Sequence, residues 1–166
     1  DENVLIDGEK IAFVGKTQPY ADNIEDITGK TVCPAFTDGH IHIESTMLTP
    51  FELAKALLPH GTASIIADPH EIANVCGKNG IDYMLKASEN IPLNVYIMLP
   101  SWVPATKFDE SGAELEAEDL REYYKNPRVL GLAEVMNYVG VINGDEDVCR
   151  LLPKYIFCTK AHQTNL

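Results

Sequence analysis

Short apolar runs alternate with polar, turn-rich segments along the chain, and the rhythm changes near residue 30. Residues 3–15 hold two apolar runs that flank Asp7-Gly8, an arrangement typical of a β-hairpin with a tight turn. Residues 16–30 are polar and rich in turn-forming residues. We therefore interpret residues 1–30 as part of a small β domain, distinct from the remainder of the chain.

Beyond residue 30, β-prone runs begin roughly every 30–35 residues, and helical stretches fill the gaps between them. This alternation predicts an α/β fold in which βα units surround a parallel sheet. The predicted strands cover residues 31–36, 62–67, 93–99 and 128–133. The predicted helices run from Thr49 to about Gly61, from Asp68 onward with an interruption at Gly77 and Gly80, over 115–125, and beyond Asp145.

Composition and net charge argue against some classes of binding partner. The chain has 166 residues, of which 45% are hydrophobic and 23% charged, as in ordinary globular domains. Its 13 Lys and Arg against 25 Asp and Glu give a net charge of −12, which argues against a nucleic-acid partner because few basic groups are available for phosphates. No apolar run approaches the ~20 residues that span a bilayer, so we expect no membrane partner. Four widely spaced cysteines without a C-x-x-C motif are typical of reduced thiols in a cytosolic protein.

The segment Asp38-Gly39-His40-Ile41-His42-Ile43-Glu44 follows the first of these predicted strands. Residues two apart on a strand point the same way, so His40 and His42 can aim both imidazoles at one point, with Asp38 and Glu44 on the same side. Two neutral imidazoles suit Zn, Mn, Fe or Ni. Two ordinary histidines on a half-exposed strand are the alternative. The position after a strand of a parallel sheet favours the metal site, because active sites gather there.

The segment Asp68-Pro69-His70-Glu71 follows the second strand and has two compatible interpretations. Asp as N-cap, Pro at the first helical position and Glu two positions later form a good helix start with no chemistry required. The same residues also lie at the sheet edge expected to carry His40 and His42. Capping explains Asp68, but it does not explain a histidine at position 70.

Two further polar residues follow the later strands. Glu134 ends a buried, β-prone run, where a carboxylate is costly unless it is paired or bound to metal. An Arg partner or a turn hydrogen bond is one interpretation. A carboxylate that bridges two cations beside His40 and His42 is the other. Ser101 follows the third strand together with Trp102, and both are candidates to line a pocket, although packing roles are commoner for such residues.

These motifs resemble a known family. Residues 33–42 are similar to the P-G-F-x-D-x-H-x-H motif of the amidohydrolase superfamily. Further stretches narrow the resemblance to the adenine deaminase family of bacteria and archaea, and it runs from about residue 3 to residue 152. Those stretches are 42–47, 66–74, 98–101, 103–106 and 131–137. Ala35 and Trp102 depart from the family pattern, and we expect Trp102 to reshape the pocket.

The resemblance implies a metal-dependent hydrolase (β/α)8 TIM-type barrel, with residues 31–166 as its amino-terminal half and a metal pair at its carboxyl end. His40 and His42 would be metal ligands, and Glu134 the bridging, catalytic carboxylate. Asp68 and Glu71 would be catalytic residues at the edge of the site, as an extra ligand or a proton relay. We add Glu44 and Ser101 as candidate substrate contacts. Manganese is the favoured metal, with iron or zinc as alternatives.

The implied reaction is hydrolysis of adenine to hypoxanthine and ammonia by a metal-activated hydroxide, as in purine salvage. A cytoplasmic homo-oligomer is expected. A closed barrel takes about 250 residues, so we expect this chain to be an amino-terminal portion that is inactive alone, because the family's later ligands lie beyond it. Two alternatives remain open: another amidohydrolase, such as a cyclic amidase, and a non-catalytic binding or assembly module derived from the half-barrel.

Overall fold

The computed structural model describes residues 2–104 and 109–144. Contacts within the chain divide it into two units, Asp1–Pro34 and Ala35–Leu166. The helix expected beyond Asp145 lies outside the described residues.

The first unit contains the predicted hairpin. Strand β1 (Asn3–Asp7) pairs antiparallel with β2 (Lys10–Gly15), and Asp7 faces Lys10 across the turn. Gly8 has a φ of 59°, a left-handed conformation that glycine adopts without a steric penalty. The hairpin prediction at Asp7-Gly8 is therefore confirmed.

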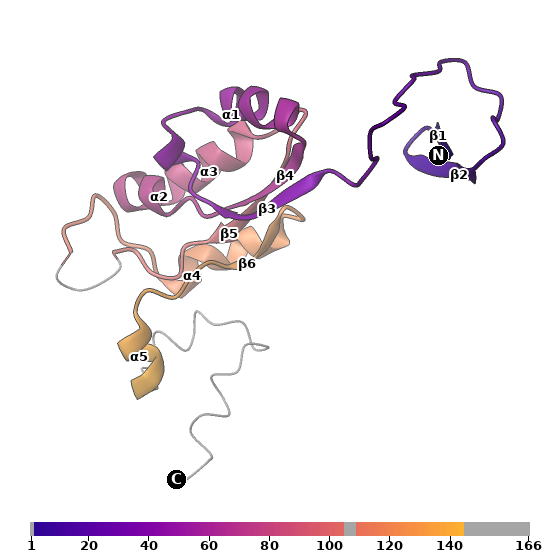
Figure 1. The fold of residues 1–166 in the computed structure, drawn as a ribbon. Helices are drawn as coiled ribbons and strands as arrows, with labels where there is room; N and C mark the ends of the chain where they lie inside the picture. The colour runs from indigo at the N-terminus through magenta and orange to yellow at the C-terminus, as the bar shows by residue number, and fades with distance from the viewer. Residues whose placement is uncertain (1, 105–108, 145–166) are drawn as a thin grey trace, which may run out of the picture. The chain divides into compact units, whose positions relative to one another are not determined.

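The second unit is built on a four-stranded parallel sheet (Figure 1). Its strands are β3 (Phe36–Ile41), β4 (Thr62–Ala67), β5 (Asn94–Leu99) and β6 (Val129–Leu132). They lie in the order β3-β4-β5-β6, so each strand pairs with the next one along the chain. This confirms the predicted βα units, and it is the strand order found in part of a (β/α)8 barrel.

The first strand of this sheet lies later than predicted. Pairing begins where Phe36 N donates to Gly61 O at 2.8 Å, whereas the prediction covered residues 31–36. Residues 31–33 are β-prone by composition, but Pro34 has no N–H to contribute to a ladder. The shift matters for the site, because it places His40 inside the strand rather than after it.

Helices connect the strands as the pattern indicated, with one shortened element. Helix α1 (Pro50–Leu57) begins at Thr49, whose side chain accepts a hydrogen bond from Glu52 N, and it continues as a 3-10 turn (Leu58–His60). Helices α2 (His70–Cys76) and α3 (Lys78–Ala87) are separated at Gly77. The helix predicted over 115–125 is α-helical only over α4 (Ala117–Leu120) and then tightens to a 3-10 helix (Arg121–Lys125). The remaining elements are a 3-10 turn (Glu44–Thr46) and α5 (Tyr138–Asn143).

The core lies between the sheet and its helices. Val95, Ile97 and Leu99 alternate along β5 as buried residues, while Tyr96 and Met98 are only partly buried. The buried strand residues form one cluster with helix residues of α1 and α3. This packing fixes the sheet, so the residues at its carboxyl ends are held on a rigid frame.

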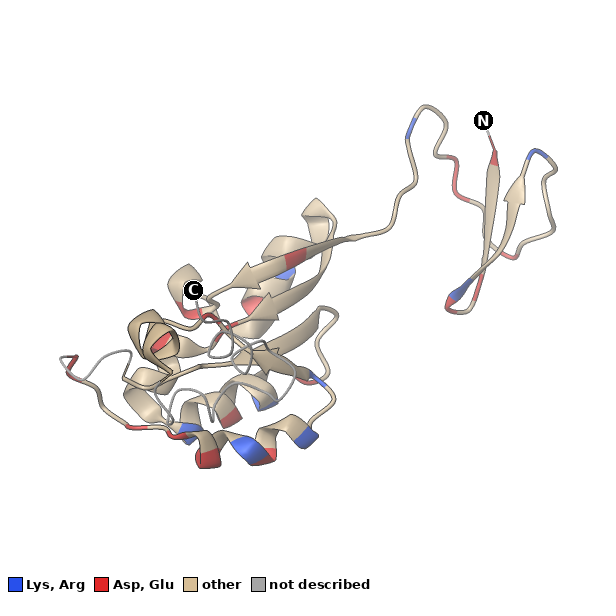
Figure 2. Ribbon diagram, turned by 90° about the horizontal axis from the view of Figure 1, so that it is seen from below, with Lys and Arg blue, Asp and Glu red and all other residues tan. Residues whose placement is uncertain are grey.

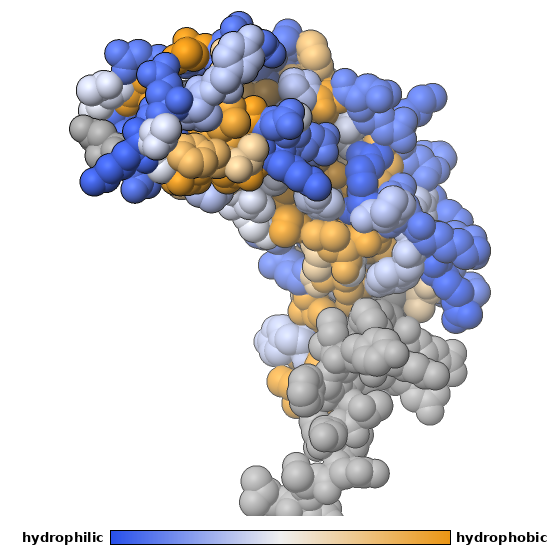
Figure 3. Space-filling model, turned by 90° about the vertical axis from the view of Figure 1, so that its right-hand side faces the viewer, coloured by the Kyte–Doolittle hydropathy of each residue, from blue (hydrophilic) through white to orange (hydrophobic). Residues whose placement is uncertain are grey.

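The surface carries charged and apolar residues together. In Figure 2 basic residues are scattered among more numerous acidic ones. Figure 3 shows apolar side chains at the surface beside hydrophilic ones, and Phe36, Tyr138 and Ile142 are among the exposed ones. Within the described ranges, none of the helices is both long enough and apolar enough to cross a bilayer. Cys33 and Cys76 are free thiols.

Candidate metal centre

Two histidines converge at the carboxyl end of β3. The Nε2 atoms of His40 and His42 lie 3.2 Å apart, and the two rings meet edge to face at 81°. Two nitrogens bound to one tetrahedral zinc ion at about 2.0–2.1 Å would be about 3.3 Å apart. The predicted convergence of these imidazoles is therefore present, at a spacing that one cation can fill.

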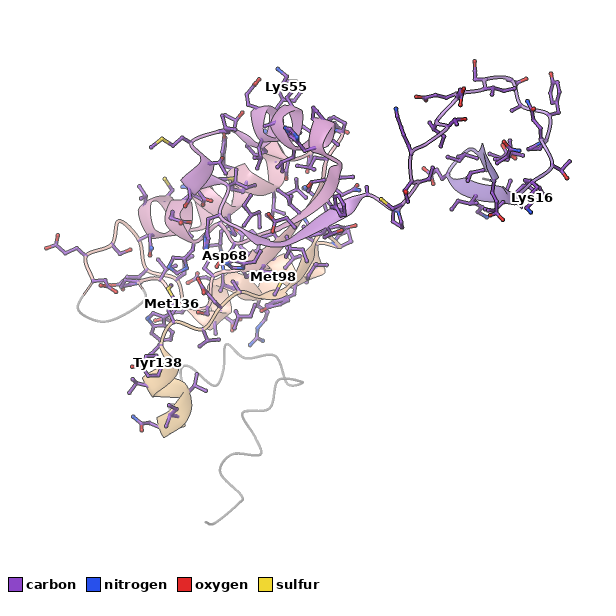
Figure 4. All side chains as sticks on the ribbon, in the orientation of Figure 1. Lys16, Lys55, Asp68, Met98, Met136 and Tyr138 are labelled. Carbon is purple, nitrogen blue, oxygen red and sulfur yellow. The ribbon has the colours of Figure 1, made fainter. Side chains whose placement is uncertain are left out.

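Carboxylates from two further strands join the histidines. Asp68 follows β4 and Glu134 follows β6, and one ligand atom from each of His40, His42, Asp68 and Glu134 lies within 4.8 Å of the others. Glu134 Oε1 is 3.8 Å from His42 Nε2. Figure 4 shows Asp68 toward the end of the sheet to which the strand arrows of Figure 1 point. Three strand ends thus supply two nitrogen and two oxygen donors to one point.

Asp68 does not cap the helix that comes after it. Asp68 is 1% exposed, yet within the described part of the chain neither of its carboxylate oxygens has a hydrogen-bond partner, and no side chain there caps the start of α2. Its backbone N instead donates to Ile41 O at 3.0 Å, which continues the pairing of β4 with β3 beyond the strands. The capping interpretation is wrong because this pairing turns the carboxylate toward the histidines. A buried, unpartnered carboxylate is costly, and a cation would relieve that cost.

Glu71 lies behind His42 rather than beside His40. Its Oε2 is 3.0 Å from His42 Nδ1, and its Oε1 accepts a hydrogen bond from Ser45 Oγ at 3.2 Å. When Glu71 is ionised and His42 is neutral, this contact requires the proton of His42 on Nδ1, which leaves the lone pair on Nε2. Carboxylate support of a metal-binding histidine is a common arrangement in metal sites. Glu71 therefore orients the imidazole of His42.

The electrostatics of the site reflect its unbalanced negative charge. Burial lowers the pKa of His42, but Glu71, Asp68 and Glu134 together outweigh burial and raise it above the ordinary value. Burial raises the pKa of Asp68 to about 7, and the neighbouring carboxylates add to that rise while His42 opposes it. Several carboxylates therefore lie close together at this end of the sheet with little positive charge to offset theirs. A bound divalent cation would stabilise their ionised forms.

The other acidic residues of the first motif take different positions. Glu44 Oε1 accepts from Ile72 N at 3.1 Å, and its Oε2 is buried without a partner. Burial raises the pKa of Glu44 despite that hydrogen bond. Asp38 Oδ1 accepts locally from His40 N at 3.1 Å, and Asp38 does not join the four-residue group. The expected alignment of the Asp38 side chain with the two imidazoles stays a prediction.

Two residues near the site are buried. Ser101 is 2% exposed, and its Oγ donates to Glu134 O at 2.8 Å. His70, in the first turn of α2, is 8% exposed, and its Nδ1 has no hydrogen-bond partner among residues 2–104 and 109–144. Burial lowers the pKa of His70. The sequence singled out both positions, but it gave no signal that Ser101 would contact the backbone of Glu134.

The donor set fits a divalent cation. Two imidazole nitrogens and two carboxylate oxygens suit zinc, manganese and iron alike. The unpartnered oxygens of Asp68 and the supported tautomer of His42 are the features expected of residues that share a cation. The sequence missed Ser45, which lies 26 residues from its partner Glu71 and shows no local signal for that contact.

Comparisons with known proteins show what the chain is similar to. A model of the amidohydrolase family matches residues 31–155. Over 150 residues the chain is 49% identical to the adenine deaminase of Bacillus velezensis, covering 90% of this chain and 26% of that protein. It is 51% identical to the adenine deaminases of Bacillus subtilis (84% of this chain, 24% of that protein) and Clostridium acetobutylicum (90% and 26%). The chain thus spans about a quarter of the length of these relatives.

Proposed function

The chain belongs to the amidohydrolase family, and from that premise we propose that the complete protein carrying it deaminates adenine hydrolytically. The observation that carries the proposal is the four-donor group of His40, His42, Asp68 and Glu134, in a chain about half identical to adenine deaminases. Water adds to C6 of adenine, the exocyclic amino group leaves as ammonia, and hypoxanthine is the product.

The donors of this chain would hold a divalent metal, with manganese preferred and iron or zinc as alternatives. A bound pair of such ions supplies Lewis acidity and a water of lowered pKa. His40 and His42 would present their Nε2 atoms to the cation, and the Glu71 carboxylate would hold the proton of His42 on Nδ1. Glu134, which follows β6 and lies 3.8 Å from His42 Nε2, would be the bridging carboxylate of such a pair.

Asp68 has a different part in the proposal. In its ionised form it adds a buried oxygen donor at the end of β4, opposite the histidines of β3. Each ionised carboxylate also offsets positive charge that the cation brings into the site. Glu44 and Ser101, expected to contact substrate, are engaged with Ile72 N and Glu134 O respectively. Their direct contact with adenine stays a prediction.

The test is an adenine deaminase assay on the complete protein supplied with Mn²⁺. Conversion of adenine to hypoxanthine is followed by the change in ultraviolet absorbance, and hydantoin and dihydropyrimidine are offered in parallel as cyclic amides. We expect turnover of adenine and no ring opening. Turnover of the cyclic amides alone would reject the proposal in favour of a cyclic amidase.

Two comparisons sharpen the assay. The double variant His40→Asn, His42→Asn removes both nitrogen donors and should abolish turnover. The 166-residue chain assayed alone should be inactive, and adenine turnover by it would reject the expectation that later ligands are required. A homo-oligomeric state and a cytoplasmic location belong to the same proposal, and sedimentation of the purified protein and fractionation of its host cells test them.

A further inference from the structure

The hydroxyl of Ser101 lies where strand pairing between β5 and β6 ends. The last backbone hydrogen bond between these two segments, within the described residues, runs from Ala133 N to Leu99 O at 2.7 Å. Two residues after Leu99, Ser101 Oγ donates to the carbonyl of Glu134, the residue after Ala133, at 2.8 Å. The Ser101 side chain thus joins the segments that follow β5 and β6 at the point where their backbone hydrogen bonds end.

The direction of the Glu134 side chain is not that of a continued strand. Residues two apart on a strand point to the same side, so a regular β6 would turn Glu134 to the side of Leu132. Leu132 is buried in the core at 6% exposure, whereas the Glu134 side chain is 57% exposed and reaches toward His42. The backbone therefore departs from strand geometry after Leu132, which is the last residue of β6.

Among the described residues, no side-chain hydrogen bond is recorded that would fix the Glu134 carboxylate. The contact of its carboxylate that the structure records is with His42 Nε2, at 3.8 Å, which is longer than a hydrogen bond. The bonds at Ala133 N and Glu134 O instead bracket the Cα of Glu134 from both sides. The direction of the carboxylate is therefore set through the backbone.

Ser101 is itself held firmly. It is 2% exposed and lies between the buried residues Leu99 and Val103. Leu115 N donates to Val103 O at 3.0 Å, so the segment after β5 is fixed by a second chain segment as well as by the core. The backbone that carries this hydroxyl is therefore held on two sides.

We propose that Ser101 is a positioning residue for the metal-binding carboxylate of Glu134, which it orients by holding the Glu134 carbonyl at the end of β6. The inference rests on the proposed function only in that the site binds a divalent metal. Loss of the hydroxyl should free the Glu134 backbone, so that its carboxylate is less often directed toward His42. Metal affinity should fall, whatever the substrate of the complete protein is.

The experiment compares Mn²⁺ affinity in the complete protein and its Ser101→Ala variant, measured by competition with a chromogenic chelator. We expect about a tenfold weaker affinity, at the lower end of the range for groups that support metal ligands. Ser88→Ala is the matched control, because Ser88 is also buried and its Oγ also donates to backbone carbonyls, those of Met84 and Leu85 in α3. It should lower the melting temperature and leave Mn²⁺ affinity unchanged.

A second pair of variants applies if Ser101→Ala does not fold. Ser101→Thr and Ser101→Val have the same shape and differ by the hydroxyl. The threonine variant should bind Mn²⁺ about tenfold more tightly than the valine variant, at similar melting temperatures. Equal affinities within either comparison would overturn the proposal for Ser101. If the wild-type protein binds no divalent metal, the proposed function fails instead, so the two failures are distinguishable.

Discussion

His42 Nδ1 lies 3.0 Å from Glu71 Oε2, which joins the carboxyl end of β3 to the first turn of α2. The carboxylate holds the imidazole in the tautomer that leaves Nε2 free for a cation. Ser45 Oγ steadies the other oxygen of Glu71 at 3.2 Å. The orientation of one metal donor therefore depends on a residue 29 positions away that is not itself in the four-donor group.

Replacing Glu71 with glutamine should weaken metal binding without removing a ligand. The amide is neutral and can present its NH₂ to Nδ1, which favours the wrong tautomer of His42. We expect roughly 10- to 100-fold lower Mn²⁺ affinity, measured by chelator competition in the complete protein. Glu52→Gln is the control, because Glu52 is also a first-turn carboxylate and pairs with Lys55 on the surface of α1. Unchanged affinity in Glu71→Gln would contradict this role.

The buried carboxyl of Asp68 should make the stability of the metal-free protein depend on pH. Its pKa rises from the ordinary 3.8 to about 7, chiefly through burial. Between those values the folded state holds a proton that the unfolded chain has released, so stability falls as pH rises from about 4 to about 7. Asp68→Asn removes this dependence. Above pH 7 we expect it to be more stable than the wild type by roughly 1–3 kcal/mol when metal is chelated.

Urea unfolding at pH 5 and pH 8 in the presence of a chelator measures this effect. The difference between variant and wild type should be larger at pH 8. With saturating Mn²⁺ the order should reverse at pH 8, because the wild type then gains a cation on Asp68 that the amide holds poorly. A variant less stable than the chelated wild type at pH 8 would show that Asp68 has partners other than a cation.

The sequence predicted the parallel sheet and the convergence of His40 and His42, because both follow from local periodicity. It left the role of Asp68 open, since the same residue types serve as helix cap and as ligand. Which of these roles Asp68 takes depends on the hydrogen bond from Asp68 N to Ile41 O, which joins the chain after β4 to β3. Contacts between distant segments, such as Ser101 with Glu134, leave no periodic trace in the sequence.

Gly80 is a second residue whose packing contact was not indicated by the sequence. Its sequence context indicated only a weakened helix, yet a Cβ at this position would lie 2.7 Å from Ile72 O. The glycine therefore allows α3 to approach the backbone of α2. Gly80→Ala should destabilise the complete protein by roughly 1–3 kcal/mol, despite the higher helix propensity of alanine, as measured by urea unfolding. Gly39→Ala, where a Cβ meets nothing within 4 Å, should cost less. A stabilising Gly80→Ala would show that α2 and α3 pack less closely.

Metal should stabilise the fold through the four-donor group. A ligand that binds only the folded state at 100 times its dissociation constant adds about 2.7 kcal/mol. We therefore expect Mn²⁺ to raise the melting temperature of the complete protein and a chelator to reverse the rise. His42→Asn should greatly reduce the shift, since it removes the imidazole that contacts His40 and Glu71 and lies nearest Glu134. His60→Asn, a histidine outside the group at the end of the turn after α1, should retain the full shift. A full shift in His42→Asn would place the metal elsewhere.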